Sequence, residues 1–484
     1  MPEESGTPGA CQSIMTTPQP NNSWRLQILT ALILCTTLGA ALVFILRDSR
    51  LLSESIKERQ PGMDRNSTPG QADQSSPFLS GKLIDGAGLP ATLPGAWPRF
   101  RGQNGDGIAS DNVSIGQKWT PLWGVDLGEG YAGAAIRDGR VYVLDYDQKN
   151  FADALRCLSL ADGREIWRFS YPVKVKRNHG MSRTTPTLAG KYVISLGPKC
   201  HVVCVDATTG QFVWGIDLVK EYNAEVPEWY AGQCPLVDGD HVILAPGGDA
   251  LMIAVELATG KVIWKTANPH DWKMTHSSIV PIEFAGKRQY VYCGSHGVIG
   301  VAANGGAVLW ETDKWVISIA TIPSPVYLGD GKLFFSGGYN SGAKMLQLRE
   351  IDGKIAPVEL FSLAATTFGA TQQTPILYQN HLYGVRPDGQ LTCLDLAGKV
   401  LWTSGSKDKF GLGPFLIADR KLFVMNDEGV LTLAEANPEE YRPLVKNRVL
   451  NGHDSWAPMA LAGSRLLVRD LTQMVCLDIT GGKP

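Results

Sequence analysis

Short apolar runs separated by polar turn residues follow one another along most of the chain. Three of them read TPTLAGKYVISL at residues 185–196, SPVYLGDGKLFFSG at residues 324–337 and APMALAGSRLLVRD at residues 457–470. Two β-rich runs around a Gly, Asp or Asn turn predict a hairpin. Each hairpin is followed by a third run, such as HVVCVD at residues 201–206, and then by a fourth run that begins after a Gly. One unit is therefore predicted to be a four-stranded antiparallel meander.

A Gly-x-x-x-Trp step marks the end of the unit and recurs through the chain. It occurs at Gly163/Trp167, Gly210/Trp214, Gly260/Trp264, Gly306/Trp310 and Gly398/Trp402. Successive tryptophans are 47, 50 and 46 residues apart, and the last interval of 92 residues spans a degenerate unit around Gly353. A period of this length is typical of the blades of an all-β propeller.

The number of units predicts eight blades, with seven as the alternative if one degenerate unit is not a blade. The unit at residues 431–444 has lost both its Gly and its Trp, and the last unit ends one strand short at CLDITGGKP. The run TPLWGVDLG at residues 120–128 carries Trp123 at the Trp position and precedes the first full unit. We expect this run to pair with the last three strands and close the ring, which leaves no exposed sheet edge.

The repeated tryptophans are interpreted as structural. Gly supplies the positive φ of a tight turn, and an indole on the outer strand buries a large area against the next blade. The residues assigned to this packing role are Trp123, Trp167, Trp214, Trp264, Trp310 and Trp402. One repeat position holds a cysteine in four different blades, so buried thiols are expected there and not disulfides; these are Cys157, Cys204, Cys393 and Cys476.

The N-terminal part has a different pattern. Residues 1–25 are predicted to be a tail, and the uncharged residues 26–46 are long enough to cross a bilayer as a helix. A cleaved signal peptide is the alternative, but the chain start lacks a basic region. Residues 47–95 are rich in Ser, Pro, Gly and Gln and predict a disordered linker before a propeller at residues 96–484.

These segments predict a single-pass protein of the inner (cytoplasmic) membrane, attached through residues 26–46, with its propeller in the periplasm. The Arg and Lys residues that follow the span favour the opposite orientation. That rule is weak before a long domain, which is translocated largely regardless of charge.

Charge and motifs exclude several function classes. The net charge is -2, so the chain carries no electrostatic footprint for nucleic acid. No Ser/His/Asp signature, metal-binding spacing or phosphate loop is present, and neither a catalytic nor a metal-ligating residue is assigned. NGDG at residues 104–107, with Asp111 nearby, offers oxygens for Ca²⁺ but lacks the spacing of a loop with a bidentate Glu, so a turn is preferred.

Aligned on these repeats, residues 97–484 resemble the pyrroloquinoline quinone (PQQ)-like β-propeller family, whose outer strands carry an Ala-x-Asp-x-x-Thr-Gly-x-x-x-Trp signature. The segment WPRFRGQNGDG at residues 97–107 and the endings LYGVRPDGQLTCLDL and LLVRDLTQMVCLD are similar to its membrane-anchored bacterial branch. That branch is similar to the propeller lipoprotein of the outer-membrane β-barrel assembly machinery. The resemblance is specific for the fold and much less so for activity.

The expected function is a non-catalytic, membrane-tethered propeller outside the cytoplasm that binds proteins or acts as a scaffold, without a cofactor. The alternative is a PQQ-dependent quinoprotein dehydrogenase, with PQQ and Ca²⁺ on the propeller axis. The resemblance implies that such an enzyme carries an adjacent Cys pair, and this chain has none. A third hypothesis, an unrecognised enzyme such as a polymer hydrolase, has no motif to support it.

Loops on one face of the propeller are the candidate binding site. In a meander, the loop entering the first strand and the loop between the second and third strands share the face opposite the Gly-Trp turns. The candidates for contact with a protein or peptide partner are Arg183, Trp229, Trp272, His276, His296, Trp315, Gln372, Arg386, Asp454, Trp456 and Arg469. Exposed aromatic residues beside charges suit protein recognition. The alternative is that these tryptophans only anchor the loops.

Overall fold

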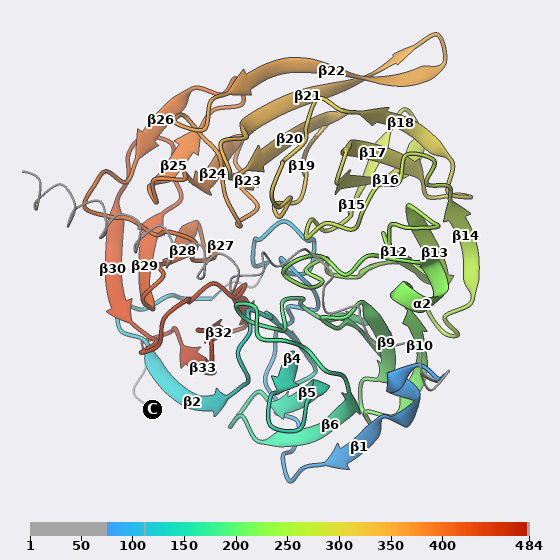
Figure 1. Ribbon diagram of the computed structural model, residues 1–484. Coiled ribbons are helices and arrows are strands. Elements are labelled where there is room, and N and C mark those ends of the chain that lie inside the picture. The colour runs from blue at the N-terminus through green and yellow to red at the C-terminus, as the bar shows by residue number, and fades with distance from the viewer. Residues whose placement is uncertain (1–74, 111–112, 482–484) are drawn as a thin grey trace, which may run out of the picture. The chain divides into compact units, whose positions relative to one another are not determined.

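Eight antiparallel sheets surround one axis in the computed structural model, which describes residues 75–110 and 113–481 (Figure 1). The prediction of an all-β propeller with eight four-stranded blades is confirmed. The predicted tail, the predicted membrane helix at residues 26–46 and the linker as far as residue 74 lie outside the described residues. Among the residues described, no helix is long and apolar enough to cross a membrane.

The blades follow one another in chain order, and their first strands meet their neighbours around the axis. Blade 1 consists of β3 (Ala134–Arg137), β4 (Arg140–Asp147), β5 (Ala152–Ser159) and β6 (Glu165–Pro172), and blade 2 of β7 (Thr187–Ala189), β8 (Tyr192–Leu196), β9 (His201–Asp206) and β10 (Phe212–Asp217). Blade 3 consists of β11 (Leu236–Asp238), β12 (His241–Leu244), β13 (Met252–Glu256) and β14 (Val262–Thr266). Blade 4 consists of β15 (Val280–Phe284), β16 (Lys287–Gly294), β17 (Gly297–Ala302) and β18 (Val308–Thr312). A short helix, α2 (Leu218–Tyr222), lies between blades 2 and 3.

Blades 5 to 8 repeat the same order. Blade 5 consists of β19 (Val326–Gly329), β20 (Lys332–Gly337), β21 (Gly342–Ile351) and β22 (Lys354–Leu363), and blade 6 of β23 (Ile376–Tyr378), β24 (His381–Val385), β25 (Leu391–Leu394) and β26 (Val400–Thr403). Blade 7 consists of β27 (Phe415–Ala418), β28 (Lys421–Met425), β29 (Val430–Glu435) and β30 (Pro443–Arg448). Blade 8 consists of β31 (Ala460–Ala462), β32 (Arg465–Arg469), β33 (Gln473–Asp478) and β2 (Thr120–Asp126).

The ring closes through β2, as the sequence predicts. This strand pairs antiparallel with β33, and Trp123 lies opposite Cys476. Figure 1 shows the two strands side by side near the C-terminal end of the chain. Blade 8 therefore takes three strands from the end of the chain and one from before blade 1, and this pairing closes the ring.

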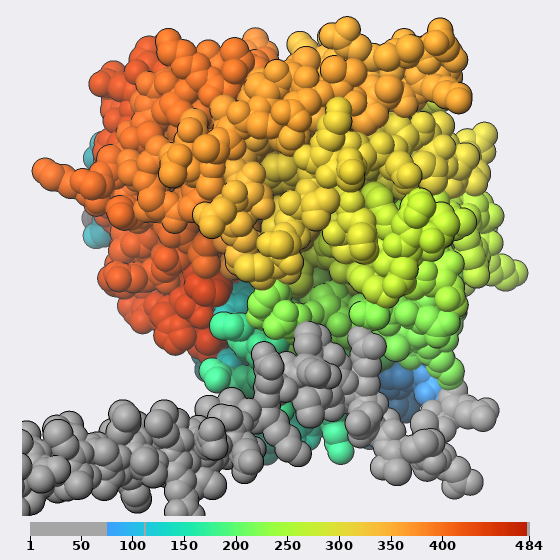
Figure 2. Space-filling view, turned by 45° about the horizontal axis from the view of Figure 1, so that its top comes forward, coloured from blue at the N-terminus to red at the C-terminus, as the bar shows by residue number. Residues whose placement is uncertain are grey.

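The Gly-x-x-x-Trp step joins several of the blades to the next one. Trp214 of blade 2 donates its indole N–H to the carbonyl of Leu257 in blade 3, with an N···O distance of 2.9 Å. The same ring covers Gly260, where a Cβ atom would lie 2.7 Å from the indole Cδ2. Gly260 has a φ of +70°, so the position requires glycine for both its backbone and its close approach to the ring. The successive blades that these contacts hold together are visible side by side in Figure 2.

Two blades that have lost the motif keep an aromatic contact at the same place. Phe361 of blade 5 takes the place of the indole and lies against Gly398 of blade 6. Trp402 of blade 6 donates to the carbonyl of Asn437 in blade 7 at 3.0 Å and packs on the Tyr441 ring. All six predicted structural tryptophans are buried. Trp310 differs in its polar contact, because it donates to Gln289 of its own blade.

Residues 77–85, inside the segment predicted to be a disordered linker, form regular structure. A 3₁₀ turn, η2 (Pro77–Ser80), places Phe78 against Tyr171 and Phe212, and the Phe78 side chain is only 3% exposed. The following strand, β1 (Lys82–Asp85), pairs antiparallel with β6 and becomes a fifth strand of blade 1. The described part of the predicted linker is therefore docked, because it buries an aromatic ring and satisfies the outer edge of blade 1.

The cysteines within the described residues are all free and buried, including the four at the shared repeat position. Burial raises the pKa of the Cys157 and Cys476 thiols to about 12. They are therefore inert packing groups.

Candidate functional site

A series of hydrogen bonds surrounds part of the axis where the entering loops meet the first strands. The backbone N–H of Thr185 donates to Cys234 Sγ at 3.2 Å, that of Cys234 to Ser278 Oγ at 3.0 Å, that of Ser278 to Ser324 Oγ at 3.1 Å, and that of Ser324 to Thr374 Oγ1 at 2.9 Å. These five residues, which we call the axial belt, occupy one repeat position in blades 2 to 6. The belt fixes the entering loops relative to one another, so side chains just before it are held on a rigid frame.

Side chains from several entering loops meet above the belt. The Tyr131 hydroxyl donates to Asp454 Oδ2 at 3.2 Å, and the Tyr131 ring lies 5.1 Å from the Trp456 ring. The guanidinium of Arg183 lies 5.1 Å from the centre of the same tyrosine ring, within the range of a cation–π contact. We call the following residues the loop-face cluster: Tyr131, Arg183, Trp229, His276, Asp454 and Trp456.

Arg183 and His276 are the polar centre of this cluster. His276 lies beside the Trp229 ring, with 6.4 Å between ring centres, and burial together with the charge of Arg183 lowers its pKa to about 4. Its imidazole is therefore neutral at pH 7. Burial also lowers the pKa of Arg183 to about 10, which leaves the side chain charged. Within the described residues, Arg183 Nε and His276 Nε2 have no hydrogen-bond partner, and Arg183 forms no ion pair with a carboxylate.

The Arg183 guanidinium is half-buried, faces an aromatic ring and lacks a carboxylate, and a ligand that supplied an acceptor would offset the cost of its desolvation. Trp456 on the other side of the cluster is already fixed, because its indole N–H donates to Asp427 Oδ1 at 2.7 Å. The same carboxylate oxygen accepts the backbone N–H of Leu412 at 2.8 Å. The cluster thus combines rigid aromatic walls with one unpartnered N–H donor, Arg183 Nε, to which a carboxylate can bind.

The remaining predicted face residues do not join the cluster. Trp272 and Trp315 are only 5% and 4% exposed and anchor their loops against their own blades, as the alternative interpretation proposed. His296 is exposed and bonded through Nδ1 to Ser295, and Arg386 pairs with Asp388 in its own loop. Gln372 lines a small cavity of about 70 Å³ that Trp456 also borders.

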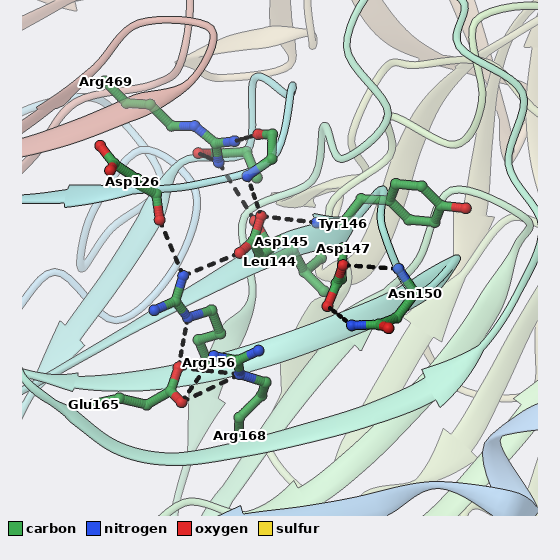
Figure 3. Close-up of polar contacts among 12 residues, drawn as sticks. Asp126, Leu144, Asp145, Tyr146, Asp147, Asn150, Arg156, Glu165, Arg168 and Arg469 are labelled. Carbon is green, nitrogen blue, oxygen red and sulfur yellow. Dashed lines mark hydrogen bonds and ion pairs between the residues drawn. The ribbon is translucent and has the colours of Figure 1, made fainter. Parts of the chain in front are cut away.

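The prediction that Arg469 faces a partner is wrong. Its side chain is 3% exposed and donates to the carbonyls of Ala132 at 3.1 Å, Leu144 at 3.3 Å and Gly128 at 2.9 Å. These carbonyls belong to blade 1 and the loop before it, whereas Arg469 ends β32 of blade 8. Figure 3 shows the guanidinium directed at this backbone. Arg469 therefore joins the last blade to the first, and its guanidinium donates to backbone carbonyls within the protein instead of facing a partner.

A second arginine strengthens the same junction. Arg156 of β5 donates to the carbonyl of Asp126 in β2 at 3.2 Å and forms ion pairs with Asp145 at 3.0 Å and Glu165 at 2.6 Å (Figure 3). Arg168 shares the Glu165 carboxylate at 3.0 Å. These charges are partly buried and form a network, so they contribute more than isolated surface pairs.

Sequence reasoning missed Tyr131 and the segment at residues 97–110. Tyr131 lies in the entering loop of blade 1, so the repeat alignment could have placed it on the same face. Residues 97–110 bridge the first strands: Trp97 pairs with Ile136 of blade 1, and Ile108 pairs with Ile417 of blade 7. Arg101 of this segment bonds the carbonyls of Thr374 and Pro375 at 2.7 and 3.0 Å. No local pattern in the sequence indicates that this segment contacts the first strands around the propeller axis.

The described residues do not fit PQQ with Ca²⁺ as the alternative function requires. No three His, Cys, Asp or Glu side chains in the described part of the chain are grouped so as to hold a metal ion. No two cysteines are adjacent, and the described ones are buried in the sheets. We therefore derive no chemistry through this cofactor.

Comparison with known proteins agrees with the architecture. A family model described as outer membrane protein assembly factor BamB matches residues 151–398, just over half of the chain. The outer membrane protein assembly factor BamB of Yersinia pestis is 24% identical over 299 residues, covering 56% of this chain and 70% of that protein.

Solved structures extend the likeness in fold alone, because their sequence identities are low. BamB from Moraxella catarrhalis has a TM-score of 0.52 at 14% identity and covers 75% of this chain and 100% of that one. The quinohemoprotein alcohol dehydrogenase ADHIIG of Pseudomonas putida HK5 has a TM-score of 0.53 at 12% identity, covering 83% and 84%. A europium-containing methanol dehydrogenase has a TM-score of 0.56 at 11% identity, covering 80% and 98%.

The comparison also corrects the predicted location. The matched relatives are outer membrane protein assembly factors, which contradicts the expectation of a single-pass protein of the inner membrane with a periplasmic propeller. Its eight blades, its Gly-Trp junctions and the family match together show that the chain belongs to the PQQ-like propeller family described as outer membrane protein assembly factor BamB.

Proposed function

We propose that this propeller is a non-catalytic scaffold that binds a protein partner through the loop-face cluster. The observation that carries the proposal is Arg183, a half-buried guanidinium whose Nε has no hydrogen-bond partner and which pairs with no carboxylate among the described residues, set beside His276 and the Tyr131 ring. An acidic side chain or a chain-terminal carboxylate of a partner would supply the missing acceptor, and the rings would contact its apolar part.

The relatives support the kind of partner. Their name, outer membrane protein assembly factor, supports proteins of outer membrane assembly as the expected partners of this chain. The dehydrogenase neighbours share the fold at 11–12% identity and lend no support to catalysis. The absence of a cofactor remains a prediction.

Site-directed photo-crosslinking in cells tests the proposal. A photoreactive residue at position 229 is expected to give a discrete protein adduct, whereas one at the exposed Val308, on the outer strand β18, is not. Arg183→Met should reduce the adduct at least several-fold. Arg177→Met is the matched control, because Arg177 lies on the same loop but is exposed and paired with Glu129. Equal adducts in both Arg variants would contradict the proposal.

Dye reduction separates the scaffold from the dehydrogenase. The purified chain with added PQQ, Ca²⁺ and an artificial electron acceptor is expected to oxidise neither alcohols nor sugars. PQQ-dependent turnover would replace the scaffold hypothesis with the enzyme.

A further inference from the structure

An axial cavity of about 360 Å³ lies between the segment at residues 99–106 and the first strands of blades 3, 4 and 5. Its volume falls within the lower part of the range of small-molecule sites. The belt residues Cys234, Ser278 and Ser324 border the cavity at one end. From the belt, its lining follows the first strands towards the face of the Gly-Trp turns. The cavity is therefore separate from the loop-face cluster, which precedes the belt.

Two arginines of the segment line this cavity. Arg101 uses its donors on backbone carbonyls, namely those of Gly105 at 3.1 Å, Asp106 at 2.8 Å, Thr374 and Pro375. Arg99 makes one hydrogen bond, from Nη2 to the carbonyl of Gln103 at 3.0 Å. Neither guanidinium forms an ion pair with a carboxylate in the part of the chain that the structure describes. Arg99 therefore keeps donors for a ligand.

The local charge balance is positive. Asp106 is the acidic residue in the lining, and its Oδ1 already accepts the backbone N–H of Ile108 at 2.9 Å. Two cations and one anion thus line the cavity, and the nearby Asp238 is already paired with Arg288 at 2.6 Å. Both arginines are half-buried, and burial lowers the pKa of Arg101 to about 10 and also lowers that of Arg99, against the opposing effect of the Asp106 charge. An anion in the cavity would offset the cost of this burial.

The opposite wall is mostly apolar and rigid. It includes Ile279, Val280, Pro281 and Val326, contributed by blades 4 and 5. The Ser324 hydroxyl at the belt accepts a backbone N–H and still carries its own hydrogen to donate. An apolar wall facing a guanidinium suits a molecule with a ring or short chain at one end and an oxyanion at the other.

We propose that the axial cavity binds a small organic anion, with its carboxylate or phosphate on Arg99 and its apolar body against blades 4 and 5. Arg101 holds the segment in place and adds positive potential. The ligand is of the size of about one or two fused rings, given the cavity volume. This inference does not depend on the proposed function, because it concerns another part of the axis.

Isothermal titration calorimetry of the full chain tests the inference with three probes: 2-naphthoate, 2-naphthyl phosphate and the neutral 2-naphthamide. At least one anion is expected to bind with one site per chain, and about tenfold or more tightly than the amide, as a charge-assisted contact requires. The anion that binds more tightly identifies the group as carboxylate or phosphate.

Variants locate the site. Arg99→Met should weaken the anion about tenfold or more and leave the amide unchanged, whereas Val280→Trp should fill the cavity and abolish both. Arg164→Met is the control, because Arg164 is exposed on the face of the Gly-Trp turns and should change nothing. Unaltered melting temperatures establish that each variant is folded. Failure of both anions to bind at millimolar concentration, or equal affinity in Arg99→Met and wild type, would overturn the inference.

Discussion

The contact of Gly260 with Trp214 allows the junction between blades to be measured with a matched pair of glycines. Gly260 and Gly286 have φ values of +70° and +67°, so alanine at either position must adopt the left-handed conformation. That conformation costs about 1–2 kcal/mol. A Cβ atom at residue 260 would lie 2.7 Å from Trp214 Cδ2, whereas one at residue 286 has no atom within 4 Å. The overlap adds about 1–3 kcal/mol, the usual cost of overpacking.

Gly260→Ala is therefore expected to lower the free energy of unfolding by about 2–5 kcal/mol, and Gly286→Ala by about 1–2 kcal/mol. Trp214→Ala should cost about 3–5 kcal/mol, because it empties a buried aromatic site. In the double variant Gly260→Ala/Trp214→Ala, the glycine change should cost no more than in Gly286→Ala, since the methyl group then has space.

Urea denaturation measures these differences, with tryptophan fluorescence and circular dichroism required to give coincident transitions. The reasoning is refuted if Gly260→Ala and Gly286→Ala are equally stable. It is also refuted if the two changes in the double variant are additive.

Three further predictions concern buried charges. Arg469→Gln should lower the free energy of unfolding by about 2–3 kcal/mol because carbonyls of blade 1 lose charged donors, whereas Arg164→Met should change it by less than about 0.5 kcal/mol, as urea midpoints will show. Burial raises the pKa of Asp153 to about 7, so the folded state retains a proton that the unfolded state loses above pH 4. Between pH 5 and pH 8 the free energy of unfolding of the wild type should therefore fall by up to about 3 kcal/mol more than that of Asp153→Asn. Parallel pH profiles of the two proteins would contradict this. The lowered pKa of His276 acts in the opposite direction, so wild type should lose stability more steeply than His276→Gln from pH 6.5 down to pH 4, and equal slopes in thermal melts would count against the burial of this imidazole.

The repeats made the fold predictable, because every blade must bury the same kind of surface against the same kind of neighbour. Trp123 could be recognised as the tryptophan of an incomplete unit, and the last unit lacked one strand, so the closure followed from the sequence. Phe361 and Tyr441 were less visible, because an aromatic ring of another type supplies the contact that the motif had lost.

The site was predictable only in part. Position in the repeat placed Arg183, His276 and Trp456 on one face, but it could not distinguish a side chain that lines the loop face from one that turns inward. Arg469 turns inward because free carbonyls of blade 1 lie within its reach, and those carbonyls are brought there by ring closure. The path of residues 97–110 likewise depends on contacts with blades 1, 6 and 7, which no local pattern encodes.

That path has a consequence for biosynthesis. A ribosome delivers residues 97–110 and β2 first, but Ile417 and β33, which bond them, emerge near the end of translation. Until then β2 has no neighbour in its blade, and Ile108 lacks the strand that it pairs with. An incomplete polypeptide thus exposes an open strand and unfilled apolar surface, which are substrates for chaperones and proteases. The final assembly step is set by the last blade, so loss of the C-terminal strand β33 would leave β2 without a strand to pair with.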